Sequence, residues 1–418
     1  MPPDELAAWL RLTLTPGVGN ATARRLLAAF GLPQQVFAQS ASALRQVVTA
    51  AQASALLQEP PGLPAQIETT WQWLMQPGEE AGGPQDAAVT RSIVTLGDEN
   101  YPPSLLATED PPLLLYLMGR CDWLQATGWP AALAIVGSRN PTPQGQINAR
   151  QFAQALAGQM AVVSGLALGI DGAAHEGALQ GAQPERLATI AVIGTGADRV
   201  YPARHRDLAH RIARQGLLVS EYPLGTPPAA ANFPKRNRII SGLSLGALVV
   251  EAALQSGSLI TARLAAEQGK EVFAIPGSIH GTQSRGCHAL IRQGAKLVET
   301  AQDILEELRL PASRPQQRAE GQRHQILEEL RLPASRPAPA APATPAPSTA
   351  PTVSAPPPAG GPHASLLTAL GADPASLDAL QARTGWPTPQ LQAALLELEL
   401  AGQVGRLPGG LFQRLGAA

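Results

Sequence analysis

Short apolar runs of four to six residues alternate with amphipathic stretches of ten or more between about residues 89 and 309. The runs are rich in Ala, Val, Ile and Leu and have no polar face, which is typical of strands buried on both sides by helices. This alternation predicts an α/β fold with a Rossmann-like, doubly wound parallel sheet, whose ligands bind at the carboxyl ends of the strands. The predicted strands are 131–136, 161–164, 189–193, 217–220, 248–251 and 271–275.

Different patterns flank this region and predict further domains. Residues 1–80 contain short helical stretches broken by Ser, Thr and Gly, which predicts a small helical domain of the helix-hairpin-helix or SAM-like kind. The turn at residues 15–20 precedes a helix with Arg24 and Arg25, so its amides could face a DNA phosphate; an ordinary glycine turn between packed helices is the alternative. The main α/β domain is expected over residues 85–310.

The C-terminal third changes composition twice. Residues 311–362 are rich in Ala and Pro, which predicts an extended linker. Residues 363–418 show three helical patterns and a glycine-turned hairpin, typical of a winged-helix domain. The third helical pattern, 389–400, carries acids and no base, which favours packing or protein contact over groove reading. The segment ILEELRLPASRP occurs twice, at 304–315 and 326–337, and predicts no function.

Overall charge and cysteine content narrow the class of protein. The 418 residues carry a net charge of −1, no membrane-length apolar run and no N-terminal apolar segment of the secretory type. The two cysteines, Cys121 and Cys287, lie far apart without metal-ligand spacing, so neither a disulfide nor a zinc site is predicted. A cytoplasmic protein without membrane contact, metal or cofactor is expected.

The positive charge is concentrated in one segment. Between Arg199 and Arg238 there are eight bases and two acids, although the whole chain is nearly neutral. Such a cluster predicts a local contact with a polyanion.

Three loops that follow predicted strands or begin helices carry the candidate site. A small residue at a helix start lets backbone amides approach an anion, and arginine adds a bidentate donor. In the third loop, bases stand beside an aromatic ring and an amide, a combination that suits the phosphates and bases of a single strand. The segment 255–262 is a further hydroxyl- and glycine-rich helix start. The candidate DNA-binding residues are Gly137, Ser138 and Arg139, Ser164 and Gly165, and Phe233, Lys235, Arg236, Asn237 and Arg238.

The motifs AIVGSRNPTPQG, VVSGLALGIDGAAHEGAL, FPKRNRIISGLS and VVEAALQSGSLITARLAAEQGKEVFAIPG resemble, in order and spacing, the DNA-processing protein A (DprA/Smf) family over residues 90–300. The resemblance implies a non-enzymatic recombination mediator that binds single-stranded DNA and loads a RecA-type recombinase during natural transformation. It also implies that the candidate residues line the strand-binding pocket. A homodimer through the region Leu290–Leu297 is implied as well.

Two alternatives remain open. The segment 194–196 followed by Arg199, with Glu221 after the next strand, imitates a dinucleotide fingerprint that lacks its third glycine. The helix start after Glu251 resembles that of Rossmann-like nucleotide phosphoribohydrolases, in which Glu251 would be the acid/base and Arg139 the phosphate anchor. The scattered histidines supply no general-base constellation.

The mediator hypothesis makes geometric demands. Arg139 and Lys235 should lie on one side of the molecule, and replacing either by Ala should abolish single-strand binding. Four side chains that neutralise about four phosphates would give a log-log salt slope of roughly −3.

Overall fold

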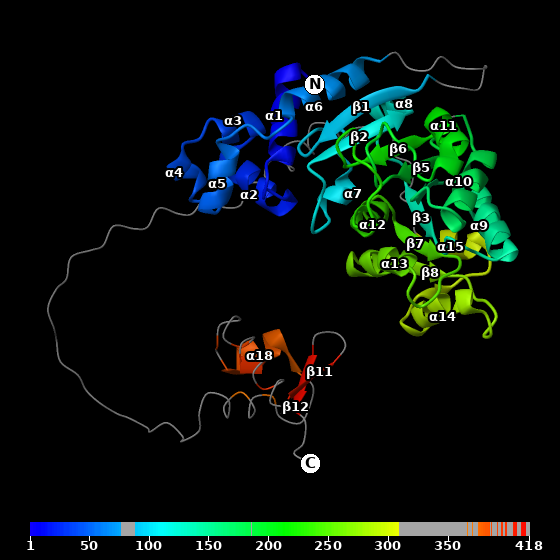
Figure 1. Cartoon of the computed structure of the whole chain (residues 1–418). Coiled ribbons are helices and arrows are strands. Elements are labelled where there is room, and N and C mark those ends of the chain that lie inside the picture. Colours follow the sequence, from blue (N-terminus) through cyan, green and yellow to red (C-terminus); the bar gives the residue numbers. More distant parts are fainter. Residues whose placement is uncertain are drawn as a thin grey trace, which may run out of the picture. The chain divides into compact units, whose positions relative to one another are not determined.

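The computed structural model describes residues 1–76, 88–184 and 186–308. In the C-terminal part it describes residues 375–384, 386, 404–407 and 411–414, and single positions between 366 and 398. The chain divides into two compact units, 1–336 and 337–418, and each is considered by itself (Figure 1).

A nine-stranded sheet forms the centre of the first unit, in the order β1-β2-β6-β5-β4-β3-β7-β8-β9. Neighbouring strands from β6 to β9 pair in parallel, whereas β1 pairs with β2 and β2 with β6 in antiparallel register. The strands are β1 (Thr90–Thr95), β2 (Leu114–Gly119), β3 (Ala132–Val136), β4 (Ala161–Ser164), β5 (Thr189–Val192), β6 (Leu217–Ser220), β7 (Gly246–Val249), β8 (Glu271–Ala274) and β9 (Lys296–Leu297).

Helices cover both faces of this sheet (Figure 1). They are α7 (Pro103–Leu106), α8 (Cys121–Thr127), α9 (Pro143–Leu156), α10 (Ile170–Gln180), α11 (Arg206–Gln215), α12 (Asn232–Gly242), α13 (Ser258–Glu267), α14 (Arg285–Arg292) and α15 (Ala301–Glu307), with short 3₁₀ turns at Ala203–His205 and Thr282–Ser284.

Successive residues of β3 enter two different cores, which shows the doubly wound arrangement directly. Leu133 and Ile135 pack with side chains of α9, α10 and α15. Ala134 and Val136 belong to the opposite core, which includes Ile239 of α12. Because every β3 side chain is buried, the strand reads as a continuous apolar run in the sequence.

The N-terminal helices form a bundle in the same unit. Buried Leu6, Trp9 and Leu10 of the first helix contribute to its core. The helices are α1 (Pro3–Leu14), α2 (Asn20–Phe30), α3 (Pro33–Phe37), α4 (Ala41–Leu44), α5 (Ala50–Leu56) and α6 (Leu63–Met75).

One aspartate joins this bundle to the sheet region. The Arg24 Nη1 atom of α2 lies 2.9 Å from Asp110 Oδ1, and Asn20 Nδ2 donates to Asp110 Oδ2 at 3.2 Å. From the other side, Arg238 Nη1 of α12 donates to the Asp110 carbonyl at 2.6 Å, and Arg238 Nε lies 3.3 Å from Oδ2. Asp110 is therefore shared by a helix of the bundle and a helix of the α/β region.

The second unit contains a three-stranded antiparallel sheet in the order β10-β12-β11. Its elements are β10 (Ala375–Ser376), α18 (Leu377–Thr384), β11 (Val404–Leu407) and β12 (Leu411–Arg414). Leu391, Leu395 and Leu398 are buried with Leu380 and Val404 in one apolar cluster. The hairpin β11–β12 behind a helical core is the arrangement expected of a winged helix.

The predicted fold class is confirmed, with additions to the sheet. All six predicted strands are present within two residues of the expected bounds, and they are the parallel ones. The antiparallel β1 and β2 and the short edge strand β9 were not predicted, so the sheet is mixed. The predicted linker at 311–362 lies outside the described residues. None of the described helices is both long and apolar enough to cross a bilayer.

Candidate nucleic-acid interface

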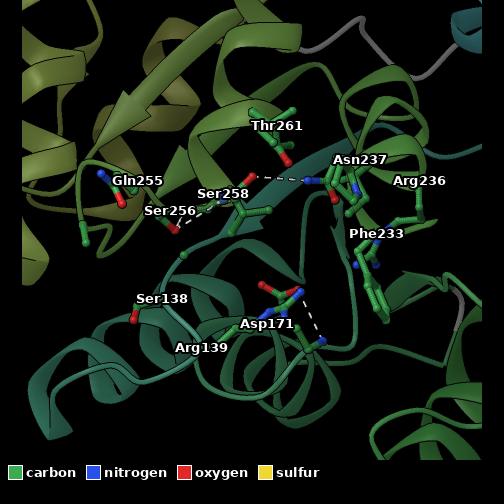
Figure 2. A pocket seen from close by; sticks show the side chains of 18 of the residues that line it. Ser138, Arg139, Asp171, Phe233, Arg236, Asn237, Gln255, Ser256, Ser258 and Thr261 are labelled. Carbon is green, nitrogen blue, oxygen red and sulfur yellow. Dashed lines mark hydrogen bonds between the residues drawn. The ribbon is translucent and has the colours of Figure 1, made fainter. Parts of the chain in front are cut away.

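A cavity of about 800 Å³ opens at the carboxyl ends of the parallel strands (Figure 2). Its walls come from the loops after β3, β4 and β5, the first half of α12 with the loop before it, the loop between β7 and α13, and a loop before α14. The polar and aromatic lining residues are Ser138, Arg139, Asn140, Asp171, Tyr201, Phe233, Arg236, Asn237, Gln255, Ser256, Ser258, Thr261 and Gln283.

The loop after β3 is held tightly by main-chain contacts. Ser138 N donates to the Glu251 carbonyl at 2.7 Å, and the Ser138 carbonyl accepts from Ile170 N at 3.1 Å. A β-carbon on Gly137 would lie 2.8 Å from the Glu251 carbonyl oxygen, so only glycine fits between these segments. The exposed side chain of Arg139 thus extends into the cavity from a fixed backbone (Figure 2).

The Glu251 carboxylate holds the start of α9. Thr142 donates to it twice, from its amide at 2.9 Å and from its hydroxyl at 2.6 Å. A β-carbon on Gly145 would lie 2.6 Å from Glu251 Oε2, so the carboxylate rests against the first turn of the helix. An anion is stabilised there by the free amides and the helix dipole. Glu251 is engaged in structure and does not line the cavity.

The loop after β4 forms the floor. Asp171 Oδ2 accepts hydrogen bonds from Gly165 N at 3.1 Å and from Ala167 N at 3.4 Å. Between them Leu166 has a φ of 58°, a left-handed conformation that an L residue adopts at a cost of about 1 kcal/mol. Ser164 is fully buried and donates to the Ile135 carbonyl at 2.6 Å. Ser164 and Gly165 therefore support the floor and are not part of the lining.

Arg236 lies under this floor with its guanidinium group buried. It is 3% exposed, and its Nη1 donates to the Val192 carbonyl. Burial lowers the pKa of Arg236 to about 10, against the opposing effect of Asp171. Burial likewise raises the pKa of Asp171, although the Arg236 charge and the two amides oppose that shift. The pair places one positive and one negative group beneath the cavity.

Aromatic rings form the wall next to Arg139. The Arg139 Cζ atom lies 5.4 Å from the centre of the Phe233 ring, and the Tyr201 ring centre is 5.6 Å from that of Phe233. Asn237 Nδ2 donates to the Gly257 carbonyl at 3.3 Å, which joins α12 to the loop before α13. A guanidinium beside a stacking surface is the combination that binds a phosphate and its base together.

Helical geometry divides the predicted residues of α12 between two faces. Phe233, Arg236, Asn237 and Ile240 follow the i, i+3, i+4, i+7 pattern and line the cavity. Lys235 and Arg238 lie on other faces of the helix and do not line it.

Lys235 and Arg238 instead surround a buried carboxylate. The Arg238 guanidinium pairs with Glu221, whose side chain is 6% exposed. Lys235 Nζ lies 4.0 Å from Glu221 Oε1 and 6.0 Å from the centre of the Tyr222 ring, and its side chain is 54% exposed. Of the predicted bases, Arg139 and Arg236 are the two that line the cavity.

Some lining residues were missed or only partly anticipated. Ser256, Ser258 and Thr261 lie in the helix start noted in the sequence but not assigned to the site. Tyr201 and Gln283 come from irregular segments without a recognisable motif. The other glycine-rich segment serves packing, because the Gly194 carbonyl accepts from Asn232 Nδ2 at 3.1 Å.

A mixed Rossmann-like sheet with a cationic, aromatic cavity at its carboxyl edge, joined to a winged-helix unit, defines the class of this protein. The family model described as "DNA recombination-mediator protein A" matches residues 92–309, and the "DprA winged helix domain" matches residues 333–410. The chain belongs to the DNA processing protein A (DprA/Smf) family.

Individual relatives agree with this assignment. The chain is 40% identical to Protein Smf of Escherichia coli over 346 residues, which is 82% of this chain and 80% of that protein. It is 47% identical to the DNA processing protein DprA of Streptococcus pneumoniae over 210 residues, 50% of this chain and 72% of that protein. The X-ray structure of the Streptococcus pneumoniae protein superposes with a TM-score of 0.60 at 35% identity, covering 74% of this chain and 99% of that one.

Proposed function

We propose that this protein is a cytoplasmic recombination mediator that binds single-stranded DNA in the cavity and loads a RecA-type recombinase onto it during natural transformation. The observation that carries the binding proposal is the Arg139 guanidinium 5.4 Å from the Phe233 ring at the cavity wall. Family membership supports the mediator role.

In this proposal Arg139 neutralises a phosphate, while Phe233 and Tyr201 stack against an adjacent base. The buried Arg236 fixes the floor and adds positive potential from below. The hydroxyls of Ser256 and Ser258 at the start of α13 are further donors for phosphate oxygens. Single-stranded DNA suits this cavity better than a duplex, because stacking on a ring requires an unpaired base.

A binding role is favoured over catalysis by the state of the acidic groups. Asp171, the one carboxylate of the described residues that lines the cavity, is 7% exposed and accepts two main-chain amides. Glu251, the acid/base of the phosphoribohydrolase alternative, is occupied by Thr142. Neither is placed to exchange a proton with a nucleotide in the cavity.

The other site residues take supporting roles in the proposal. Lys235 contacts the strand at the flank of the cavity through its exposed amine. Arg238 is a positioning residue that fixes α12 through Glu221. A homodimer through Leu290–Leu297 would use α14 and the edge strand β9, where Leu297 is 50% exposed.

Fluorescence anisotropy with labelled oligonucleotides tests the proposal. We expect single strands to bind more tightly than duplex of equal length, and Arg139→Ala to weaken the binding of a five-nucleotide strand at least tenfold. Two lining arginines give an expected salt slope of about −1.4 for this short strand, in place of the −3 expected from four bases. Arg263→Ala, on the exposed side of α13, is the matched control.

Equal affinity for single and double strands, or an unchanged affinity of Arg139→Ala, would overturn the binding proposal. Release of a free base from a purine mononucleotide would support the enzyme alternative instead. Displacement of a single-strand-binding protein by recombinase, with and without this protein, tests the loading step.

A further inference from the structure

We infer that the outer face of α11 continues the nucleic-acid path from the cavity along the flank of the molecule. This face is called the α11 ridge and consists of Arg204, Arg206, Arg211 and Arg214. The inference rests on the proposed single-strand binding in the cavity and concerns the DNA beyond it.

The ridge is the polar side of a strongly amphipathic helix. Leu208, Ala209, Ile212 and Ala213 of α11 are buried against the sheet. The arginines therefore face away from the core, and three of the four are exposed, Arg214 being partly buried. Asp207 is the single acid on this side of the helix.

The guanidinium groups of the ridge have no partner within the described part of the protein. No hydrogen bond or ion pair with residues 1–76, 88–184 or 186–308 engages any of the four. Arg206, the first residue of α11, also stands where the helix dipole disfavours a cation. Unpaired arginines on one helix face, one of them against the dipole, are positioned to bind an external polyanion.

The ridge begins at the cavity. Tyr201, which lines the cavity, precedes the 3₁₀ turn Ala203–His205 that leads into α11. His205 Nδ1 contacts the Leu166 carbonyl at 3.0 Å, so the turn is fixed to the loop that forms the cavity floor. A strand that leaves the Tyr201 and Phe233 rings thus meets Arg204 and Arg206 first.

The far end of the ridge lies at the opposite edge of the sheet. The carbonyl of Gln215, the last residue of α11, accepts from Ala188 N at 3.0 Å, just before β5 begins. Ten residues of helix span about 15 Å, enough to follow roughly four phosphates at the spacing of a stacked strand. Single-stranded DNA is therefore the occupant favoured over an acidic protein, because the ridge is continuous with the cavity.

Oligonucleotide length separates the ridge from the cavity. The test compares wild type with Arg206→Gln/Arg211→Gln/Arg214→Gln, using five- and twenty-nucleotide strands in fluorescence anisotropy. We expect the triple variant to bind the long strand about tenfold more weakly, with a salt slope smaller by about 2. Binding of the short strand should change less than twofold. The control variant Arg45→Gln/Arg186→Gln/Arg263→Gln removes the same charge from exposed positions elsewhere.

Each other outcome has a definite meaning. An equal loss for the short and the long strand, or the same loss in the control variant, would overturn the ridge, because net charge alone would then explain the effect. An unchanged affinity for the long strand would also overturn it and leave the arginines to a protein partner. If wild type bound neither strand, the proposed function itself would fail. Thermal unfolding of all variants checks that the fold is kept.

Discussion

The guanidinium group of Arg236 passes directly over the backbone of Gly165. A β-carbon at position 165 would lie 2.6 Å from Arg236 Cζ, well inside van der Waals contact. Because Arg236 is buried and bonded to Val192, it cannot move aside without leaving its partner. We expect Gly165→Ala to lower the free energy of unfolding by about 1–3 kcal/mol and to weaken single-strand binding. Urea denaturation and anisotropy measure the two effects.

The control for this change is Gly257→Ala. A β-carbon at position 257 meets no atom within 4 Å, and its φ of −61° suits any residue. Its unfolding free energy should stay within about 0.5 kcal/mol of wild type. If Gly165→Ala were equally harmless, the packing of Arg236 on Gly165 would not matter to the fold.

Neighbouring bases of α12 should respond differently to mutation. Arg238→Met leaves the buried Glu221 without its main partner and is expected to cost about 3 kcal/mol of stability. Lys235→Met, at an exposed position, is expected to cost less than about 0.5 kcal/mol. The double variant Arg238→Met/Glu221→Leu should recover most of the loss, because no unpaired charge remains. Thermal denaturation distinguishes the three variants, and a stable Arg238→Met would contradict the arrangement.

Acid stability should depend on His175. Its ring is fully buried, and its Nδ1 lies 2.7 Å from Thr189 Oγ1. That hydroxyl donates to the Val162 carbonyl, so Nδ1 carries the proton and Nε2 has no partner among the described residues. Burial lowers the pKa of His175 to about 3, with smaller effects from His205 and Arg236.

The sign of the effect follows from linkage. Between pH 6.5 and 3 the unfolded chain takes up a proton at His175 and the folded protein does not, so stability falls as the pH falls. At pH 5 this loss amounts to about 2 kcal/mol relative to pH 7. Urea midpoints at both pH values should differ by that much more in wild type than in His175→Gln. Equal pH dependence in the two proteins would remove His175 as the cause.

Glu251 offers a test between structural and chemical roles. Glu251→Ala removes two hydrogen-bond acceptors from Thr142 and is expected to lower stability by about 1–2 kcal/mol. The main-chain contact between Ser138 and residue 251 remains, so single-strand affinity should fall less than threefold. Differential scanning calorimetry and anisotropy provide the measurements. A large change in binding with unchanged stability would point to direct contact between Glu251 and a ligand.

The parallel strands could be predicted because they are buried on both faces and therefore appear as uninterrupted apolar runs. β2 is also apolar, but nothing in periodicity distinguishes such a run from a buried helix. β1 is only half buried, and β9 has two residues, so neither produces a clear pattern. Antiparallel pairing of β2 depends on contacts that are remote in sequence.

The loops of the site were predictable for a similar reason, since the carboxyl ends of parallel strands meet at one edge. The division of α12 was within reach of the sequence as well. Residues advance by about 100° around a helix, so Lys235, Arg236 and Arg238 cannot face one cavity together. The burial of Arg236 was not predictable, because it depends on Gly165 and Asp171 from another loop.

Asp110 accepts bonds from Arg24 of the N-terminal bundle and from Arg238 of α12, the helix that carries Phe233. A ligand that shifts α12 must therefore change how firmly the bundle is held. By thermodynamic reciprocity, a partner that grips or loosens the bundle changes the cavity's affinity for its ligand by the same factor.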